Sequence, residues 1–186
     1  MIKHFCATPW VNYSNRANGY IRVCCFANQG PTSGILRKED GSPYTYKDKI
    51  NDTRNCQLLK DIRKSILNGE WHPECIRCKR EQKSKADRDD LCAISSYEYF
   101  NEEDAIKHTS SDGSIDVDKV PIYHYDLRFG NKCNLRCRMC YATDSDGWYR
   151  DLEKIYRKTV FEDLDEKIKI IYKDGKYIAE NDPYGW

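Results

Sequence analysis

Ten cysteines in a chain of 186 residues constrain what this sequence can fold into more than any other feature. Several lie in tight groups, as in "CIRC" at 75–78 and "CNLRCRMC" at 133–140. The spacings C-x2-C and C-x3-C place thiols close enough to share one metal ion or cluster, whereas structural disulfides belong to oxidising compartments. The first residues, "MIKHFCATPW", contain no apolar stretch long enough for a signal peptide. We therefore expect a cytoplasmic protein whose cysteines bind metal or a cluster, with a secreted disulfide framework as the lesser alternative.

Charge and hydropathy argue against two large classes of partner. The chain has 31 Lys and Arg residues against 30 Asp and Glu residues, a formal net charge of +1. Such a balance creates no overall field that would attract nucleic acid or an acidic membrane surface. No run of residues approaches the roughly 18 apolar residues of a membrane-spanning helix. We expect neither a nucleic-acid partner nor a membrane partner.

The N-terminal half predicts a hairpin followed by a helix. Residues 5–27 contain two β-prone runs joined by an Asn- and Gly-rich turn, and residues 28–54 carry the Gly and Pro signals of an irregular connection. Over residues 55–69 the apolar side chains recur at helical spacing, with Asn55 as a candidate N-cap and Gly69 placed to end the helix. The helix face that should lie in the core carries Leu58, Leu59, Ile62 and Ile66.

The C-terminal half predicts a linker and then a strand, a loop and a helix. Residues 101–121 are polar and low in apolar content, which is typical of a linker. Residues 122–129 form an apolar run that predicts a strand; the cysteine-rich octapeptide follows it, and an amphipathic helix follows the octapeptide. The pair Asp174-Gly175 between β-prone runs predicts a terminal hairpin.

The octapeptide lacks a fourth ligand. Cys133, Cys137 and Cys140 crowd one loop, no cysteine follows them, and the nearest earlier one is Cys92. A structural zinc site or a ferredoxin cluster normally takes four protein ligands, so three thiolates on a cluster would leave one iron open to a small molecule. Basic residues flank the thiols and would offset the negative charge of such a cluster; they are Lys132, Arg136 and Arg138.

The C-x3-C-x2-C spacing after a first strand resembles the signature of the radical S-adenosylmethionine enzymes. The resemblance implies that Cys133, Cys137 and Cys140 hold a catalytic 4Fe-4S cluster whose open iron chelates S-adenosylmethionine. It also implies that Met139 and Tyr141 contact this cofactor, Met139 lying against the adenine. Reduction of the cluster would then cleave the cofactor to methionine and a 5′-deoxyadenosyl radical that abstracts hydrogen from a substrate.

A second pattern lies in the N-terminal half. Cys6, Gly19 and Cys24 resemble the opening C-x(9 to 15)-G-x4-C of the SPASM and twitch auxiliary-cluster domains that accompany many such enzymes. The resemblance implies a second, auxiliary 4Fe-4S cluster, which Cys75 and Cys78 would complete to four ligands. Gly19 suits a tight turn beside a cluster, because glycine tolerates positive φ.

Alternatives remain open for the N-terminal cysteines. Zinc on Cys6, Cys24, Cys75 and Cys78 is the main one, and Cys25 could replace Cys24, although strand alternation sends neighbouring side chains to opposite faces. Cys56 and Cys92 fit neither pattern and are interpreted as ordinary thiols. The four histidines are isolated in the sequence, and His72 beside Cys75 is expected to support a ligand or lie on the surface.

These patterns predict an α+β protein with a small twitch/SPASM-like domain over residues 1–100, a linker over 101–121 and the start of a radical enzyme core over 122–186. A core of this kind is a partial TIM barrel of several βα units, on the order of 200 residues, whereas 46 residues follow Cys140 and no Gly-Gly-Glu segment is present. We expect the N-terminal portion of an enzyme that needs the remainder of the barrel, in cis or from a second chain. The resemblance implies an electron donor such as flavodoxin or ferredoxin and a peptide or protein substrate. The alternative function is a zinc-binding interaction module without catalysis.

Overall fold

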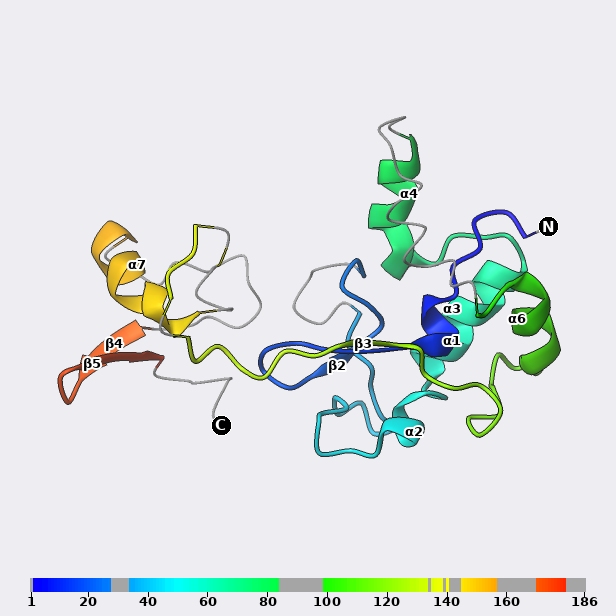
Figure 1. The fold of residues 1–186 in the computed structure, drawn as a ribbon, viewed down its shortest axis with the longest axis horizontal. Coiled ribbons are helices and arrows are strands. Elements are labelled where there is room, and N and C mark those ends of the chain that lie inside the picture. Colours follow the sequence, from blue (N-terminus) through cyan, green and yellow to red (C-terminus); the bar gives the residue numbers. More distant parts are fainter. Residues whose placement is uncertain are drawn as a thin grey trace. The chain divides into compact units, whose positions relative to one another are not determined.

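The computed structural model describes residues 2–27, 34–83, 99–133, 135–138, 140, 145–156 and 170–179. The chain divides into two compact units. The first comprises Met1–Asn15, Tyr20–Gln29 and Ser33–Leu127, and the second comprises Arg16–Gly19, Gly30–Thr32 and Arg128–Trp186. Helices and small sheets are both present, so the predicted α+β class agrees with the structure at this level (Figure 1).

A three-stranded sheet organises the first unit. Strand β1 (Asn12–Asn15) pairs antiparallel with β2 (Ile21–Arg22) and parallel with β3 (His124–Asp126), in the order β2-β1-β3 (Figure 1). The hairpin expected within residues 5–27 is therefore confirmed. The strand expected over 122–129 is shorter, and it pairs with the N-terminal hairpin.

An ion pair links the outer strands of this sheet. Arg22 on β2 donates to Asp126 on β3 at 3.0 Å, and the hydroxyl of Ser14 on β1 donates to the same carboxylate at 2.9 Å. Ser14 and Arg22 are buried and Asp126 is 23% exposed, so the pair is partly shielded from water and couples all three strands.

Helix α3 (Gln57–Leu67) confirms the helix predicted over residues 55–69. It lies against α1 (Thr8–Val11), a single turn in place of the β-prone run expected there (Figure 1). Three residues of the predicted apolar face are buried and Leu58 is partly buried, and they pack with Trp10 and Val11 of α1 in one core. Gly69, with φ of +71°, ends the helix as predicted.

The N-cap position of α3 differs from the prediction. Cys56 occupies it, and the Asn55 side chain instead accepts hydrogen bonds from the backbone N–H of Ile115 at 3.0 Å and from the guanidinium of Arg63 at 3.2 Å. A long-range partner has replaced the local one, because the Asn55 oxygen satisfies two buried donors in the tertiary structure.

The prediction of a linker over residues 101–121 is wrong. The segment contains helix α6 (Glu102–His108), which begins with a capping box between Asn101 and Asp104. Ala105 and Val120 are completely buried, so the segment packs into the first unit. Composition misled the prediction because a short segment needs only a few apolar residues, correctly placed, to join a core. The two units divide at Leu127, not within this segment.

The remaining elements complete the two units. Residues 34–54 form mostly isolated bridges, consistent with the irregular connection expected there, and end in α2 (Ile50–Thr53). The second unit contains η2 (Asp146–Trp148), α7 (Tyr149–Tyr156) and the hairpin of β4 (Ile170–Lys173) and β5 (Lys176–Ala179), which confirms the terminal hairpin. Among the helices in the described part of the chain, none is long and apolar enough to cross a membrane.

Candidate metal centres

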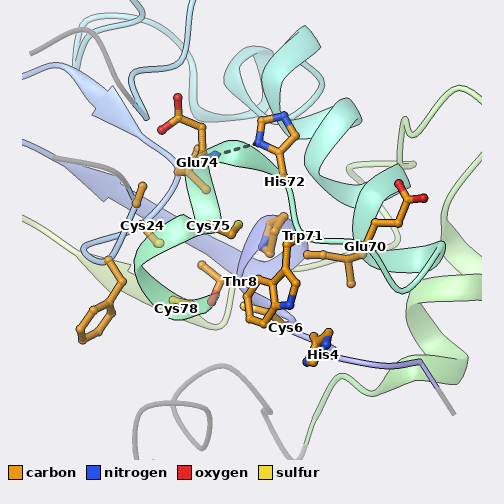
Figure 2. Close-up of a pocket in the computed structure, with 15 residues that line it drawn as sticks. His4, Cys6, Thr8, Cys24, Glu70, Trp71, His72, Glu74, Cys75 and Cys78 are labelled. Carbon is orange, nitrogen blue, oxygen red and sulfur yellow. Dashed lines mark hydrogen bonds between the residues drawn. The ribbon is translucent and has the colours of Figure 1, made fainter. Parts of the chain in front are cut away.

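Four cysteines from three separate segments of the first unit line one pocket. The pocket encloses a cavity of about 50 Å³. Figure 2 shows the four side chains gathered beside Trp71 and Thr8. They are the same four cysteines that the sequence predicts to hold an auxiliary cluster or zinc: Cys6, Cys24, Cys75 and Cys78.

Local structure explains how each thiol reaches the pocket. Cys6 lies just before α1, and Cys24 follows β2 in a turn closed by the N–H of Ala27, which donates to the Cys24 carbonyl at 3.3 Å. Cys75 ends the short helix η1 (Pro73–Cys75), and Cys78 lies in the first turn of α4 (Ile76–Lys83). Residues three apart in helical backbone face the same side, so the C-x2-C spacing presents both thiols together.

His72 caps the helical segment that carries these two cysteines. Its Nδ1 accepts a hydrogen bond from the backbone N–H of Glu74 at 3.2 Å (Figure 2). The N–H of Cys75 donates to the His72 carbonyl at 2.9 Å. Burial lowers the pKa of His72, although nearby Glu74 and Asp61 oppose the shift. His72 thus stays neutral at pH 7 and orients Cys75 through the backbone.

Burial and neighbouring thiols disfavour the charged forms of Cys24 and Cys75. Burial, followed by the proximity of Cys6, raises the pKa of Cys24 to about 12. Burial also raises the pKa of Cys75, and Cys6, Cys24 and Cys78 add to this shift in that order. Without a cation the buried thiols therefore keep their protons, and a bound metal group would displace them.

Cys24 and its neighbour Cys25 differ in whether they line the pocket. Cys24 lines the cavity, whereas Cys25 is not among the lining residues. The sequence left these two cysteines as alternatives, and the turn that follows β2 selects the first of them for this pocket.

Three lining residues, His4, Trp71 and Glu74, were not anticipated. The imidazole of His4 stacks on the indole of Trp71 with ring centroids 4.6 Å apart, and His4 adopts a φ of +70° that is uncommon for a residue other than glycine. No local sequence signal joins these residues, because the contact forms only when the N-terminus folds over the segment that follows α3. Glu74 also lines the pocket, and its buried Oε2 has no hydrogen-bond partner within the part of the chain that the structure describes.

The other predicted site lies in the second unit, on a segment called here the thiol loop, residues 131–140. Cys133 and Cys140 are half-buried and Cys137 is exposed. A turn brings the N–H of Cys140 to the carbonyl of Cys137 at 3.0 Å, and the backbone N–H of Leu135 donates to the sulfur of Cys133 at 3.4 Å. Met139 and Tyr141, predicted to contact S-adenosylmethionine, lie outside the described residues, as does Cys92.

Two of the three basic residues beside these thiols already have carboxylate partners. Lys132 lies 3.5 Å from Asp146, and Arg136 lies 2.8 Å from Asp151. The expected offset of a cluster's negative charge by these cations is therefore reduced, since each carboxylate neutralises much of the cation's field.

The donor chemistry of the two sites can be compared with what metals require. Thiols are the ligands of zinc and of iron-sulfur clusters, so the donor set of the four-cysteine pocket fits either group. Within the described residues, no three or more His, Cys, Asp or Glu side chains are grouped so that they could hold a metal ion as they stand. Ligation by the pocket thiols, or by Cys133, Cys137 and Cys140 of the thiol loop, would thus require the side chains to rearrange. No known protein family, curated protein or solved structure matches this chain.

Proposed function

We propose that this chain belongs to a radical S-adenosylmethionine enzyme and carries two 4Fe-4S clusters. The thiol loop would hold the catalytic cluster through Cys133, Cys137 and Cys140. The four-cysteine pocket would hold the auxiliary cluster through Cys6, Cys24, Cys75 and Cys78.

The convergence of the four cysteines on one pocket is the observation that carries the proposal. Cys56 provides a contrast, since it is a buried thiol whose pKa is raised mainly by burial and it lines no part of the pocket. Burial is also the main cause of the raised pKa of Cys24 and Cys75, but in the pocket the neighbouring thiols add to both shifts, and a cation bound among them would stabilise the thiolates.

The thiol loop supports the catalytic half of the proposal through its ligand number and its hydrogen bonding. Three thiols leave one coordination position for a small molecule, and the N–H of Leu135 already donates to the sulfur of Cys133. A cluster bound there would supply the electron for reductive cleavage of S-adenosylmethionine. This chain's own residues bind the metal, orient the first thiol and, at Met139 and Tyr141, contact the cofactor.

The proposal also specifies partners. A radical enzyme of this kind needs an electron donor such as flavodoxin or ferredoxin, a peptide or protein substrate, and further barrel strands in cis or from a second chain. Exposure of Cys137 leaves the thiol loop accessible to them. We propose a cytoplasmic location, because reduced thiols persist there.

A zinc-binding interaction module is the second candidate, and the four-cysteine pocket is the observation that favours it. Four thiolates are the ligand set of a closed structural zinc site. In that case the pocket would stabilise the fold, and the thiols of the loop would bind no cofactor.

The test is the content of iron, sulfide and zinc per chain after anaerobic reconstitution. The experiment compares the unaltered chain with a Cys133, Cys137 and Cys140 triple alanine variant and with a variant in which the four pocket cysteines are replaced by serine. We expect about eight irons in the unaltered chain and about four in each variant. The Cys56→Ala variant is the control and should keep all of the iron. Zinc at one per chain with iron near zero would establish the second candidate instead.

A further inference from the structure

Asp146 makes three contacts with the residues that begin the thiol loop. Its Oδ1 accepts a hydrogen bond from the backbone N–H of Cys133 at 3.1 Å, and its Oδ2 lies 3.5 Å from the ammonium of Lys132. Its own backbone N–H donates to the carbonyl of Asn131 at 2.8 Å. Asp146, at the start of η2, therefore contacts three consecutive residues of the loop. The third of them is Cys133, the first of the three loop cysteines.

The residues around Asp146 hold the middle of the loop. The hydroxyl of Ser145 donates to the carbonyl of Leu135 at 2.7 Å, and this orients the same residue whose N–H points to the Cys133 sulfur. Gly147 allows the close approach, because a Cβ there would lie 3.3 Å from the Leu135 carbonyl oxygen and 3.4 Å from that of Cys133. Ser145 is 1% exposed, so its hydrogen bond to the Leu135 carbonyl is partly shielded from water, whereas the bond from the Leu135 N–H to the Cys133 sulfur is exposed.

A third contact anchors the loop to α7. The side-chain amide of Asn131 donates to the hydroxyl of Tyr149 at 2.7 Å, and both residues are buried. Buried polar contacts of this kind persist because breaking one leaves an unsatisfied group. The backbone around Cys133 is therefore held in place by η2 and α7, and Asp146 is the carboxylate that contacts Lys132 and Cys133, whereas Asp151 of α7 pairs with Arg136 farther along the loop.

We propose that Asp146 is the positioning residue of the thiol loop, which sets both the orientation of Cys133 and the local charge around a cluster bound there. This inference rests on the proposed function, because it assumes a cluster on the thiol loop. Residues that orient ligands in this way typically change metal affinity by about 10- to 100-fold when they are replaced. Net charge near a cluster and hydrogen bonds to its sulfurs set its reduction potential.

The two roles of Asp146 can be separated by two substitutions. Asp146→Asn keeps an oxygen that can accept from the Cys133 N–H but removes the negative charge beside Lys132. Asp146→Ala removes both. We expect Asp146→Ala to lose iron from the thiol loop to a chelator about tenfold faster or more, whereas Asp146→Asn keeps near-normal iron retention.

The reduction potential of the loop cluster is a second measurement. If Asp146 acted only on the structure of the loop, Asp146→Asn and Lys132→Gln would not shift this potential in opposite directions. Removing the Asp146 charge leaves Lys132 unneutralised, so Asp146→Asn should shift the midpoint potential of the loop cluster to a more positive value. Lys132→Gln should shift it the opposite way, because a nearby positive charge stabilises the reduced cluster. Lys132 is 65% exposed, so both shifts should shrink as salt is added.

The experiment uses the full chain reconstituted anaerobically, with the electron paramagnetic resonance signal of the loop cluster defined by subtracting the spectrum of the triple alanine variant. Asp174→Asn is the matched control, since this exposed carboxylate in the β4–β5 turn belongs to the same unit. Circular dichroism checks that each variant is folded. The expected result is opposite shifts for Asp146→Asn and Lys132→Gln and unchanged behaviour for the control.

Three results would count against the inference, and they differ in whether the proposed function falls as well. If the unaltered chain holds loop iron and all Asp146 variants match it in iron retention, spectrum and potential, only the role of Asp146 is refuted. Shifts of the same sign for Asp146→Asn and Lys132→Gln also refute the role in local charge. If the triple alanine variant loses no iron relative to the unaltered chain, the proposed function fails and this inference fails with it.

Discussion

The buried guanidinium of Arg63 donates two hydrogen bonds to the backbone carbonyl of Pro9, at 3.0 Å from Nε and 2.8 Å from an Nη. Arg63 lies on α3 and Pro9 on α1, and Pro9 lines the four-cysteine pocket. The same guanidinium donates to the carbonyls of Arg54 and Gly113. A single side chain of α3 therefore holds the backbone that follows Cys6.

Replacing Arg63 should destabilise the first unit strongly. Arg63→Met removes every one of these donors and leaves buried carbonyls unsatisfied, so we expect a loss of about 3 kcal/mol of unfolding free energy. Urea unfolding of the metal-free chain measures the change. The control is Lys64→Met, because Lys64 is partly exposed and pairs with Asp61 at the surface; its effect should stay within about 0.5 kcal/mol. Equal effects of the two substitutions would contradict the role given to Arg63.

The choice between Cys24 and Cys25 can be tested directly. Cys24 lines the pocket and Cys25 does not, so Cys24→Ser should remove the metal of the N-terminal site and Cys25→Ser should leave it in place. Metal analysis after reconstitution gives the result, whether the metal is iron or zinc. Retention of full metal content by Cys24→Ser, with loss in Cys25→Ser, would show that the turn after β2 rearranges on binding.

Gly113 and Gly41 form a matched pair for a test of packing. Both have positive φ, at +87° and +82°. A Cβ on Gly113 would overlap the backbone carbonyl of Lys60, whereas a Cβ on Gly41 would meet nothing within 4 Å. Alanine at either position should lower the free energy of unfolding by about 1 kcal/mol, because its side chain disfavours the left-handed backbone. Only Gly113→Ala should lose a further amount of about 1–3 kcal/mol, because of the steric overlap with Lys60. Thermal unfolding should therefore show a clearly lower midpoint for Gly113→Ala, and similar midpoints would disprove the close approach.

The cap formed by His72 should depend on pH. Its Nδ1 acts as an acceptor only in the neutral imidazole, and burial lowers its pKa from the ordinary value of 6.5. As the pH falls below 6.5 the unfolded chain takes up a proton that the folded chain resists. The stability contributed by the neutral ring is therefore complete above pH 6.5 and declines as the pH falls toward the folded pKa.

Two substitutions isolate this effect in the metal-free chain. His72→Ala should lower stability by about 1 kcal/mol at pH 7, as the loss of a helix cap does. His72→Asn keeps a capping oxygen but cannot titrate, so its stability should vary less between pH 7 and pH 5 than that of the unaltered chain. Unfolding midpoints across this range give the measurement, and an unchanged pH profile in His72→Asn would contradict the role of the ring.

Local signals predicted the elements that depend on neighbouring residues. The apolar spacing of α3, the turn chemistry of Asp174-Gly175 and the Asn/Gly-rich turn after β1 act over a few residues, and the corresponding elements are present in the structure. C-x2-C spacing likewise identified Cys75 and Cys78, and the resemblance to SPASM and twitch domains added Cys6 and Cys24; all four line the pocket. Ligand candidates could be found because C-x2-C places two thiols on one side of a helix whatever surrounds it.

Only the tertiary structure decided the features that join distant residues. It placed α6 in the core in spite of its polar composition, chose Cys24 over Cys25 at the pocket, stacked His4 on Trp71 and turned Asn55 from a cap into a partner of Ile115. Each of these outcomes depends on which groups must be buried or hydrogen-bonded once the whole chain is compact. The sequence by itself determined which residues are candidates for metal binding and which short elements form. The packing of segments far apart in the chain determined which of those residues meet, because burial and polar satisfaction are properties of the folded whole.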